Sequence, residues 1–152
     1  MKARLAYVAM AAASLFLLPA HAADNCSGHY INVGQSADVT DLGNGNSLIV
    51  FKNVSVNVTD DRTSPIYMTS GDCVGTALIL NGATSASGRC SRKDKDGDIY
   101  SYEFSLPAGA DKGSWTFVGG TGKFAKLRWS GWWKETMASG KSAGGVWGGT
   151  CS

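Results

Sequence analysis

A glycine-rich stretch that contains a lysine, VGGTGKF at residues 118–124, is the first place where the sequence could do chemistry. Loops of this composition bind phosphate through backbone N–H groups and the lysine. A P-loop that ended at Lys123 would need glycine at 117 and Ser or Thr at 124, and phenylalanine occupies both positions. The spacing of Gly120, Gly122 and Ala125 fits the dinucleotide fingerprint, but β-like sequence follows where that fingerprint needs an α/β unit. We therefore interpret the stretch as a turn between strands.

The sequence GKSAG at residues 140–144 matches the nucleophile motif of α/β-hydrolases. In those enzymes an acidic residue and then a histidine follow the serine along the chain. The residues after Gly144 include no Asp, Glu or His. We therefore predict no serine nucleophile.

An acidic segment, RKDKDGDIYSYE at residues 92–103, can be aligned with a twelve-residue calcium loop. Asp94 and Asp96 then occupy ligand positions, but Arg92 occupies the first position, where an acidic ligand belongs, and no flanking helices are predicted. We interpret the segment as a solvated hairpin turn at Asp96-Gly97. A weak calcium site of another kind is the alternative.

The N-terminal residues 1–22 have the pattern of a secretory signal peptide. Lys2 and Arg4 precede an apolar run that is short for a membrane span, and AHA at 20–22 is a small-residue cleavage site. We predict a mature chain of residues 23–152 that forms one domain, in the periplasm or secreted, with no further segment that could span a membrane.

The charge of the predicted mature chain is balanced. Loss of Lys2 and Arg4 reduces the 14 basic residues to 12, which equals the 12 acidic residues. Because no basic block remains, we predict no nucleic-acid partner. The sequence makes no prediction about the oligomeric state.

All four cysteines lie in the part predicted to be exported, where an oxidising compartment favours disulfides. Asn81-Gly82 predicts a two-residue type I′ hairpin, in which Leu80 faces Ala83. Counting outward equally on both strands brings Cys73 opposite Cys90, at a separation that a disulfide can span. Cys26 then pairs with Cys151 by elimination.

Metal chemistry lacks the residues that it needs in the predicted mature chain. His29 is the single histidine that remains after cleavage, and one histidine cannot supply a two- or three-histidine zinc site. The cysteines are assigned to disulfides. We predict no metal site and no cofactor.

Short runs of β-branched and aromatic residues, separated by Gly, Asn and Asp, predict an all-β chain. Many consecutive strands with short connections and bridged ends favour a closed antiparallel β-barrel of about eight strands. A β-sandwich is the alternative. The predicted strands are 30–40, 47–58, 65–70, 73–80, 83–91, 98–106, 113–118, 127–137 and 142–150.

Alternation of apolar and polar residues predicts which side chains point into the barrel. The Cys73–Cys90 bridge shares one face of its hairpin with small residues, so we predict that this bridge lies outside the barrel. The predicted buried face comprises Val54, Val56 and Val58 in one strand and Val74, Leu78 and Leu80 in the hairpin.

The segments DKDGD, GSWTFVGGTGKF and SGWW resemble small exported bacterial proteins related to dirigent proteins and allene oxide cyclases. The likeness covers roughly residues 94–147. It implies an eight-stranded antiparallel barrel with a central cavity, in which VGGTGKF is a structural connection. Plant members of this group cyclise an unstable epoxide or steer radical coupling inside the barrel. No position of this chain clearly matches their functional residues, so we predict no catalytic residue.

Aromatic side chains at predicted inward positions form the candidate ligand-binding site. Phe117 is also predicted to point into the barrel, whereas Trp132 is predicted to point outward. The candidate ligand-binding residues are Tyr100, Tyr102, Phe104, Trp115, Trp129 and Trp133.

The first function hypothesis is a non-enzymatic exported barrel that binds a small apolar or aromatic molecule or has a structural role. The alternative is a cofactor-free cyclase or isomerase, which would require an acidic group such as Glu103 inside the cavity. A third hypothesis is carbohydrate binding through Trp132 and Trp147, exposed on one outer face.

Overall fold

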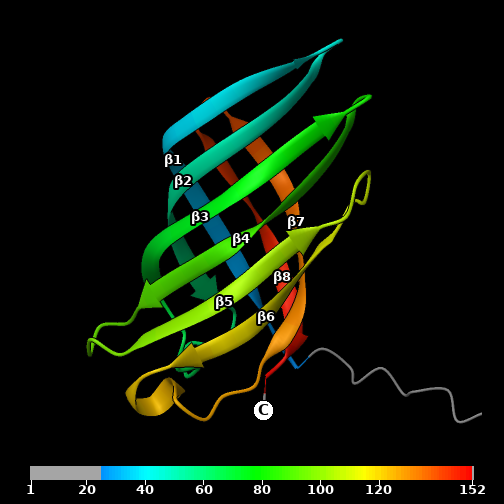
Figure 1. The fold of residues 1–152 in the computed structure, drawn as a ribbon. Helices are drawn as coiled ribbons and strands as arrows, with labels where there is room; N and C mark the ends of the chain where they lie inside the picture. Colours follow the sequence, from blue (N-terminus) through cyan, green and yellow to red (C-terminus); the bar gives the residue numbers. More distant parts are fainter. Residues whose placement is uncertain (1–24, 152) are drawn as a thin grey trace, which may run out of the picture.

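The computed structural model describes residues 25–151, and in it eight antiparallel strands close into a barrel (Figure 1). Consecutive strands are hydrogen-bonded neighbours, and β1 also pairs with β8. The closed barrel is therefore confirmed over the sandwich, while the predicted signal peptide lies outside the described residues. The elements are β1 (Cys26–Gly43), β2 (Asn46–Thr59), β3 (Thr69–Leu80), β4 (Ala83–Lys93), β5 (Ile99–Leu106), β6 (Gly113–Gly120), the 3-10 helix η1 (Gly122–Phe124), β7 (Ser130–Ser139) and β8 (Ser142–Thr150).

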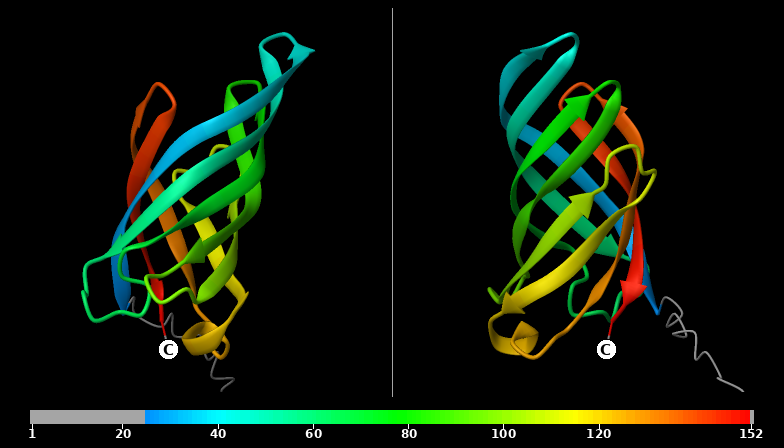
Figure 2. Two further views of the ribbon diagram at one scale, coloured as in Figure 1. Left: turned by 90° about the vertical axis from the view of Figure 1, so that its left-hand side faces the viewer. Right: turned by 45° about the vertical axis from the view of Figure 1, so that its right-hand side comes forward.

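The two ends of the barrel differ. Figure 2 shows the tips of the β1–β2, β3–β4 and β7–β8 hairpins at one end, and η1, the β2–β3 loop and the C-terminal end of the chain at the other. We call the hairpin end the mouth and the η1 end the base. Within residues 25–151 no helix is long and apolar enough to cross a membrane.

The barrel of about eight strands is confirmed, but the separate strand predicted at residues 65–70 was wrong. Only residues 69–80 form β3, and the segment before it makes turns, in which the Ser64 N–H donates to the Asp61 carbonyl at 3.2 Å and the Tyr67 N–H donates to the Ser64 carbonyl at 3.0 Å. Pro65 has no N–H to donate to a strand ladder. The apolar run there supplies Ile66, which is buried near the base.

Both predicted disulfides are present. Cys73 pairs with Cys90 in the register that the Asn81-Gly82 turn predicts, with their Cα atoms 4.0 Å apart. Asn81 and Gly82 have positive φ angles of 50° and 79°, as a type I′ turn requires. Cys26 pairs with Cys151 and joins the two ends of the barrel chain.

The predicted inner face of the β3–β4 hairpin was wrong. Cys73 and Cys90 are only 4% and 3% exposed and point into the barrel, whereas Val74 is 52% exposed on the outside. The reason lies in the neighbouring strand, because a Cβ atom on Gly88 would lie 2.6 Å from the Phe104 ring. The aromatic side chains of adjacent strands thus fill the space above the small residues of the hairpin, and the disulfide lies inside.

The predicted faces of β2 were also reversed. Ser55 and Asn57 are buried, while Val56 and Val58 are exposed on the outer surface. The buried polar groups have partners, since Ser55 Oγ accepts a hydrogen bond from Arg92 at 2.5 Å. Alternation therefore separated the residues of β2 into two faces correctly but assigned the wrong one to the interior, because the inner face is polar.

The glycine-rich stretch at 118–124 closes the base of the barrel. The Ile99 N–H donates to Thr121 Oγ1 at 2.9 Å, and Phe124, which is fully buried, lies against Tyr100 with ring centroids 5.0 Å apart. Lys123 forms ion pairs with Asp94 at 2.5 Å and with Asp96 at 2.8 Å. The stretch is a structural connection that fastens η1 to the β4–β5 turn.

This ion-pair cluster predicts a loss of stability in acid. The Lys123 ammonium lowers the pKa values of Asp94 and Asp96, in the case of Asp96 to about 2. A carboxyl whose pKa is lower in the folded state stabilises the fold above its unfolded pKa, and this stabilisation disappears as the pH falls through the folded value. We expect the thermal midpoint to fall between about pH 4 and pH 2, and Lys123→Met to have a lower midpoint at pH 6 and a weaker acid dependence. Parallel curves for the two proteins in thermal scans by circular dichroism would contradict this account.

Candidate functional site

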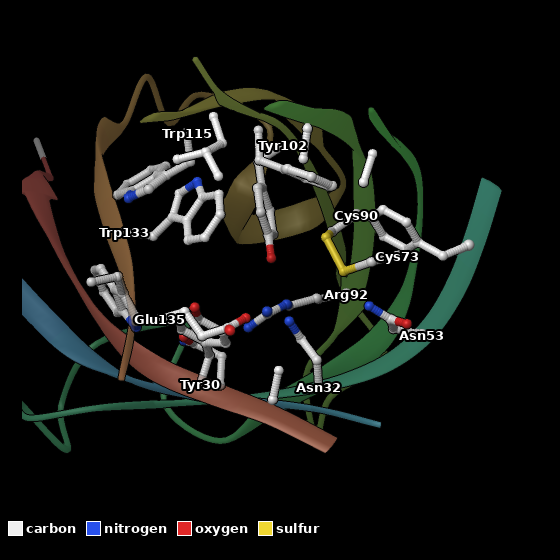
Figure 3. A pocket seen from close by; sticks show the side chains of 18 of the residues that line it. Tyr30, Asn32, Asn53, Cys73, Cys90, Arg92, Tyr102, Trp115, Trp133 and Glu135 are labelled. Carbon is white, nitrogen blue, oxygen red and sulfur yellow. A yellow bond between two sulfur atoms is a disulfide. The ribbon is translucent and has the colours of Figure 1, made fainter. Parts of the chain in front are cut away.

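The barrel encloses a cavity of about 540 Å³ that is lined largely by aromatic side chains (Figure 3). At the mouth, Ala110 and Asp111 of the β5–β6 loop line it, and toward the base Phe117 and Ile66 do so. All six candidate residues line the wall, namely Tyr100, Tyr102 and Phe104 of β5, Trp115 of β6, Trp129 just before β7, and Trp133 of β7.

The indole rings of the wall are held by the backbone of neighbouring strands. Trp115 Nε1 donates to the Trp132 carbonyl and Trp133 Nε1 donates to the Ser114 carbonyl, each at 3.2 Å. Trp133 also packs edge to face against Tyr30, with centroids 6.4 Å apart. Because their N–H groups are satisfied by backbone, these two rings present their carbon surfaces to the cavity.

Trp132 does not line the cavity, in agreement with its predicted outward direction. The Lys112 ammonium lies 4.4 Å from the centroid of its ring. Trp147, by contrast, is buried and lines the cavity. The carbohydrate hypothesis required both rings on one outer face, and this arrangement is absent.

Arg92 is a cavity residue that sequence reasoning missed. It is 4% exposed, and one Nη atom donates to Ser55 while the guanidinium lies 5.2 Å from the centroid of the Tyr102 ring. Within residues 25–151 its Nε atom has no hydrogen-bond partner and no carboxylate lies within 4.0 Å. Arg92 lies two residues after Cys90 and shares its face of β4, so the wrong prediction that this face lies outside the barrel applied to Arg92 as well.

Glu135 and Asp111 are the acidic residues that line the cavity, in place of Glu103, and both remain exposed to solvent. Glu103 forms an ion pair with Arg89 on the outer surface, whereas Glu135 lines the cavity. Burial raises the pKa of the Glu135 carboxyl, since it disfavours the charged form. The described part of the chain places no basic nitrogen within 4.0 Å of this carboxyl.

Tyr30 lies close to both charged groups. Figure 3 shows Tyr30, Glu135 and Arg92 together on one side of the cavity. Burial raises the pKa of the Tyr30 hydroxyl, and the negative charge of Glu135 raises it further. Gly145, the β8 residue that pairs with both Tyr30 and Glu135, makes room for this arrangement, because a Cβ atom there would lie 2.9 Å from the Tyr30 hydroxyl.

Three deeply buried side chains of the cavity wall carry a polar atom without a hydrogen-bond partner in the described chain. Such atoms are uncommon, because an unsatisfied buried donor costs about 1–3 kcal/mol. The three atoms are the Tyr30 hydroxyl, Arg92 Nε and Trp147 Nε1. The wall is therefore apolar over most of its area and has a few polar groups that lack protein partners.

No protein-family model and no curated protein matches the sequence. Among solved structures, the pterocarpan synthase dirigent protein GePTS1 is similar, with a TM-score of 0.49 and 14% identity over 81% of this chain and 80% of that chain. Pyocyanin demethylase has a TM-score of 0.48 and 10% identity over 83% of this chain and 99% of that chain. The pterocarpan synthase dirigent protein PsPTS1 has a TM-score of 0.48 and 12% identity over 81% of this chain and 90% of that chain. Two of the three are dirigent proteins, the family that residues 94–147 resemble, and the likeness is one of fold.

Proposed function

We propose that this chain binds one small aromatic molecule inside the barrel. The observation that carries the proposal is the cavity of about 540 Å³ with aromatic walls, which falls within the usual range for small-molecule sites. Edge-to-face and offset contacts with flat rings suit a planar ligand. The two disulfides support a place of action in the periplasm or outside the cell.

A second candidate function is proton transfer on the bound molecule without a cofactor, as in a cyclase or isomerase. Glu135 favours it, because a carboxyl in the cavity whose pKa is raised by burial can act as a general acid or base. A bound compound that is recovered unchanged supports the binding protein. A compound that is converted, with conversion lost and binding kept in Glu135→Gln, supports the enzyme.

The binding proposal predicts different effects for two adjacent tryptophans. Trp133 lines the cavity and Trp132 does not, so Trp133→Leu removes a ring contact with the ligand and Trp132→Leu does not. With the neutral probe 2-naphthamide in titration calorimetry, we expect Trp133→Leu to weaken binding about 2- to 12-fold. Trp132→Leu should leave the affinity within about 2-fold of the original. Absence of binding by the unaltered protein, or equal weakening in both variants, would refute the proposed site.

A further inference from the structure

We infer that the ligand of this cavity is an aromatic acid, whose anionic group pairs with Arg92; the inference rests on the proposed function and names its ligand class. Arg92 lines the cavity, is 4% exposed, and has no carboxylate within 4.0 Å among residues 25–151. Arginine is almost never fully buried without a partner. The cavity thus contains a guanidinium that forms no ion pair within 4.0 Å in the described chain, although the carboxylates of Glu135 and Asp111 line the same cavity.

The contacts that Arg92 does make are weaker than an ion pair. Ser55 is a neutral acceptor, the Tyr102 ring interacts with the guanidinium through its π electrons, and the guanidinium also interacts with the hydroxyls of Tyr100 and Tyr102. Nε has no partner. A guanidinium offers planar N–H groups that match the oxygens of a carboxylate, so the Nε–H of Arg92, which has no partner in residues 25–151, is suited to an aromatic carboxylate.

The surroundings of Arg92 fit the other features of such a ligand. Figure 3 shows the amide of Asn32 beside Arg92, and the aromatic rings of Trp115 and Trp133 across the cavity from them, while the Tyr102 ring lies 5.2 Å from the guanidinium. An acid group at Arg92 therefore leaves the ring system of the ligand against the aromatic wall. Since the wall is otherwise mainly apolar, a single-charge aromatic acid matches it better than a multiply charged anion.

Glu135 provides an internal control for the sign of the ligand charge. It lines the same cavity, and its carboxylate repels an anion that it does not contact. An aromatic acid should therefore bind more tightly to Glu135→Gln, whereas a neutral ligand should be little affected. An aromatic cation would show the opposite response in both the Arg92 and the Glu135 variants.

Titration calorimetry with 2-naphthoate and its neutral analogue 2-naphthamide tests the inference. We expect the unaltered protein to bind the acid at least about 10-fold more tightly than the amide. Arg92→Gln should abolish this preference by weakening only the acid, and Glu135→Gln should tighten only the acid. Equal affinities for acid and amide in the unaltered protein would overturn the inference and leave the proposed function standing.

Two further outcomes separate the inference from its premise. If neither probe binds the unaltered protein, the proposed function itself fails. Arg92→Gln is used only if it folds, as judged by its thermal transition. If it does not fold, the inference is tested by the ratio of the affinities of the unaltered protein for acid and amide, and by the effect of Glu135→Gln on acid binding. A ratio near one, or weaker acid binding in Glu135→Gln, overturns the inference.

Discussion

Replacing Phe124 by alanine is expected to lower the free energy of unfolding by about 3–5 kcal/mol. Phe124 is fully buried at the base of the barrel, where it packs against Tyr100. Its removal leaves a void next to the cavity, and the closed strands around it cannot collapse to fill the space. Urea unfolding followed by tryptophan fluorescence measures the difference.

Val118 in the same glycine-rich stretch is the matched control for Phe124. Its side chain is half exposed on the outer surface, so Val118→Ala should change the free energy of unfolding by no more than about 0.5 kcal/mol. A similar small change in both variants would mean that η1 is not part of the packed base. The stretch would then be an ordinary surface turn.

The sequence was sufficient to exclude a phosphate-binding motif in the glycine-rich stretch, but it did not predict which groups the stretch contacts. Its lysine and one of its backbone N–H groups do bind oxygen atoms, since Lys123 pairs with Asp94 and Asp96 and its N–H donates to Asp98 at 3.3 Å. These oxygens are carboxylates of the neighbouring β4–β5 turn. Their partner lies in a different part of the sequence, so local pattern could not identify it.

Strand positions, hairpin register and disulfide pairing could be predicted because they depend on local chemistry. The Asn81-Gly82 turn fixes the register, and the register brings Cys73 opposite Cys90. The predicted inward direction of the aromatic side chains in β5, β6 and β7 was also correct, because residues at alternate positions of a strand point to the same side.

The faces of β2 and of the β3–β4 hairpin could not be predicted from alternation alone. Alternation separates two faces, and the usual assumption assigns the more apolar one to the interior. Here Phe104 covers small residues on the inner side, and Ser55 bonds to Arg92 inside the barrel, while Val56 and Val74 are outside. The interior polarity depends on groups from different strands, which only the assembled barrel brings together.

Arg92 and Glu135 were missed for the same reason. A charged residue in a short strand is normally assigned to solvent, and nothing near either residue in the sequence supplies a buried partner. The barrel brings β4, β7 and β1 around one cavity and so places both charges with Tyr30. The aromatic half of the candidate site was thus predictable, and its polar half was not.

A bulky side chain placed inside the barrel should abolish binding. Ala86 lines the cavity on β4, on the mouth side of Arg92, and its side chain is small enough to leave the interior open. In Ala86→Trp the indole would occupy the path between the mouth and Arg92. We expect its affinity for 2-naphthamide to fall by at least about 100-fold, because a filled cavity cannot accept a ring without displacing close-packed atoms.

Titration calorimetry of 2-naphthamide with Ala86→Trp and with Ser87→Trp distinguishes a ligand site inside the barrel from one on its outer surface. Ser87 is the next residue on β4 and is exposed on the outer surface, so its variant adds the same indole outside the barrel. With unchanged circular dichroism for both variants, we expect one molecule bound per chain in the unaltered protein and in Ser87→Trp, and no binding heat in Ala86→Trp. Binding by Ala86→Trp with unchanged affinity and stoichiometry would contradict a ligand site inside the barrel.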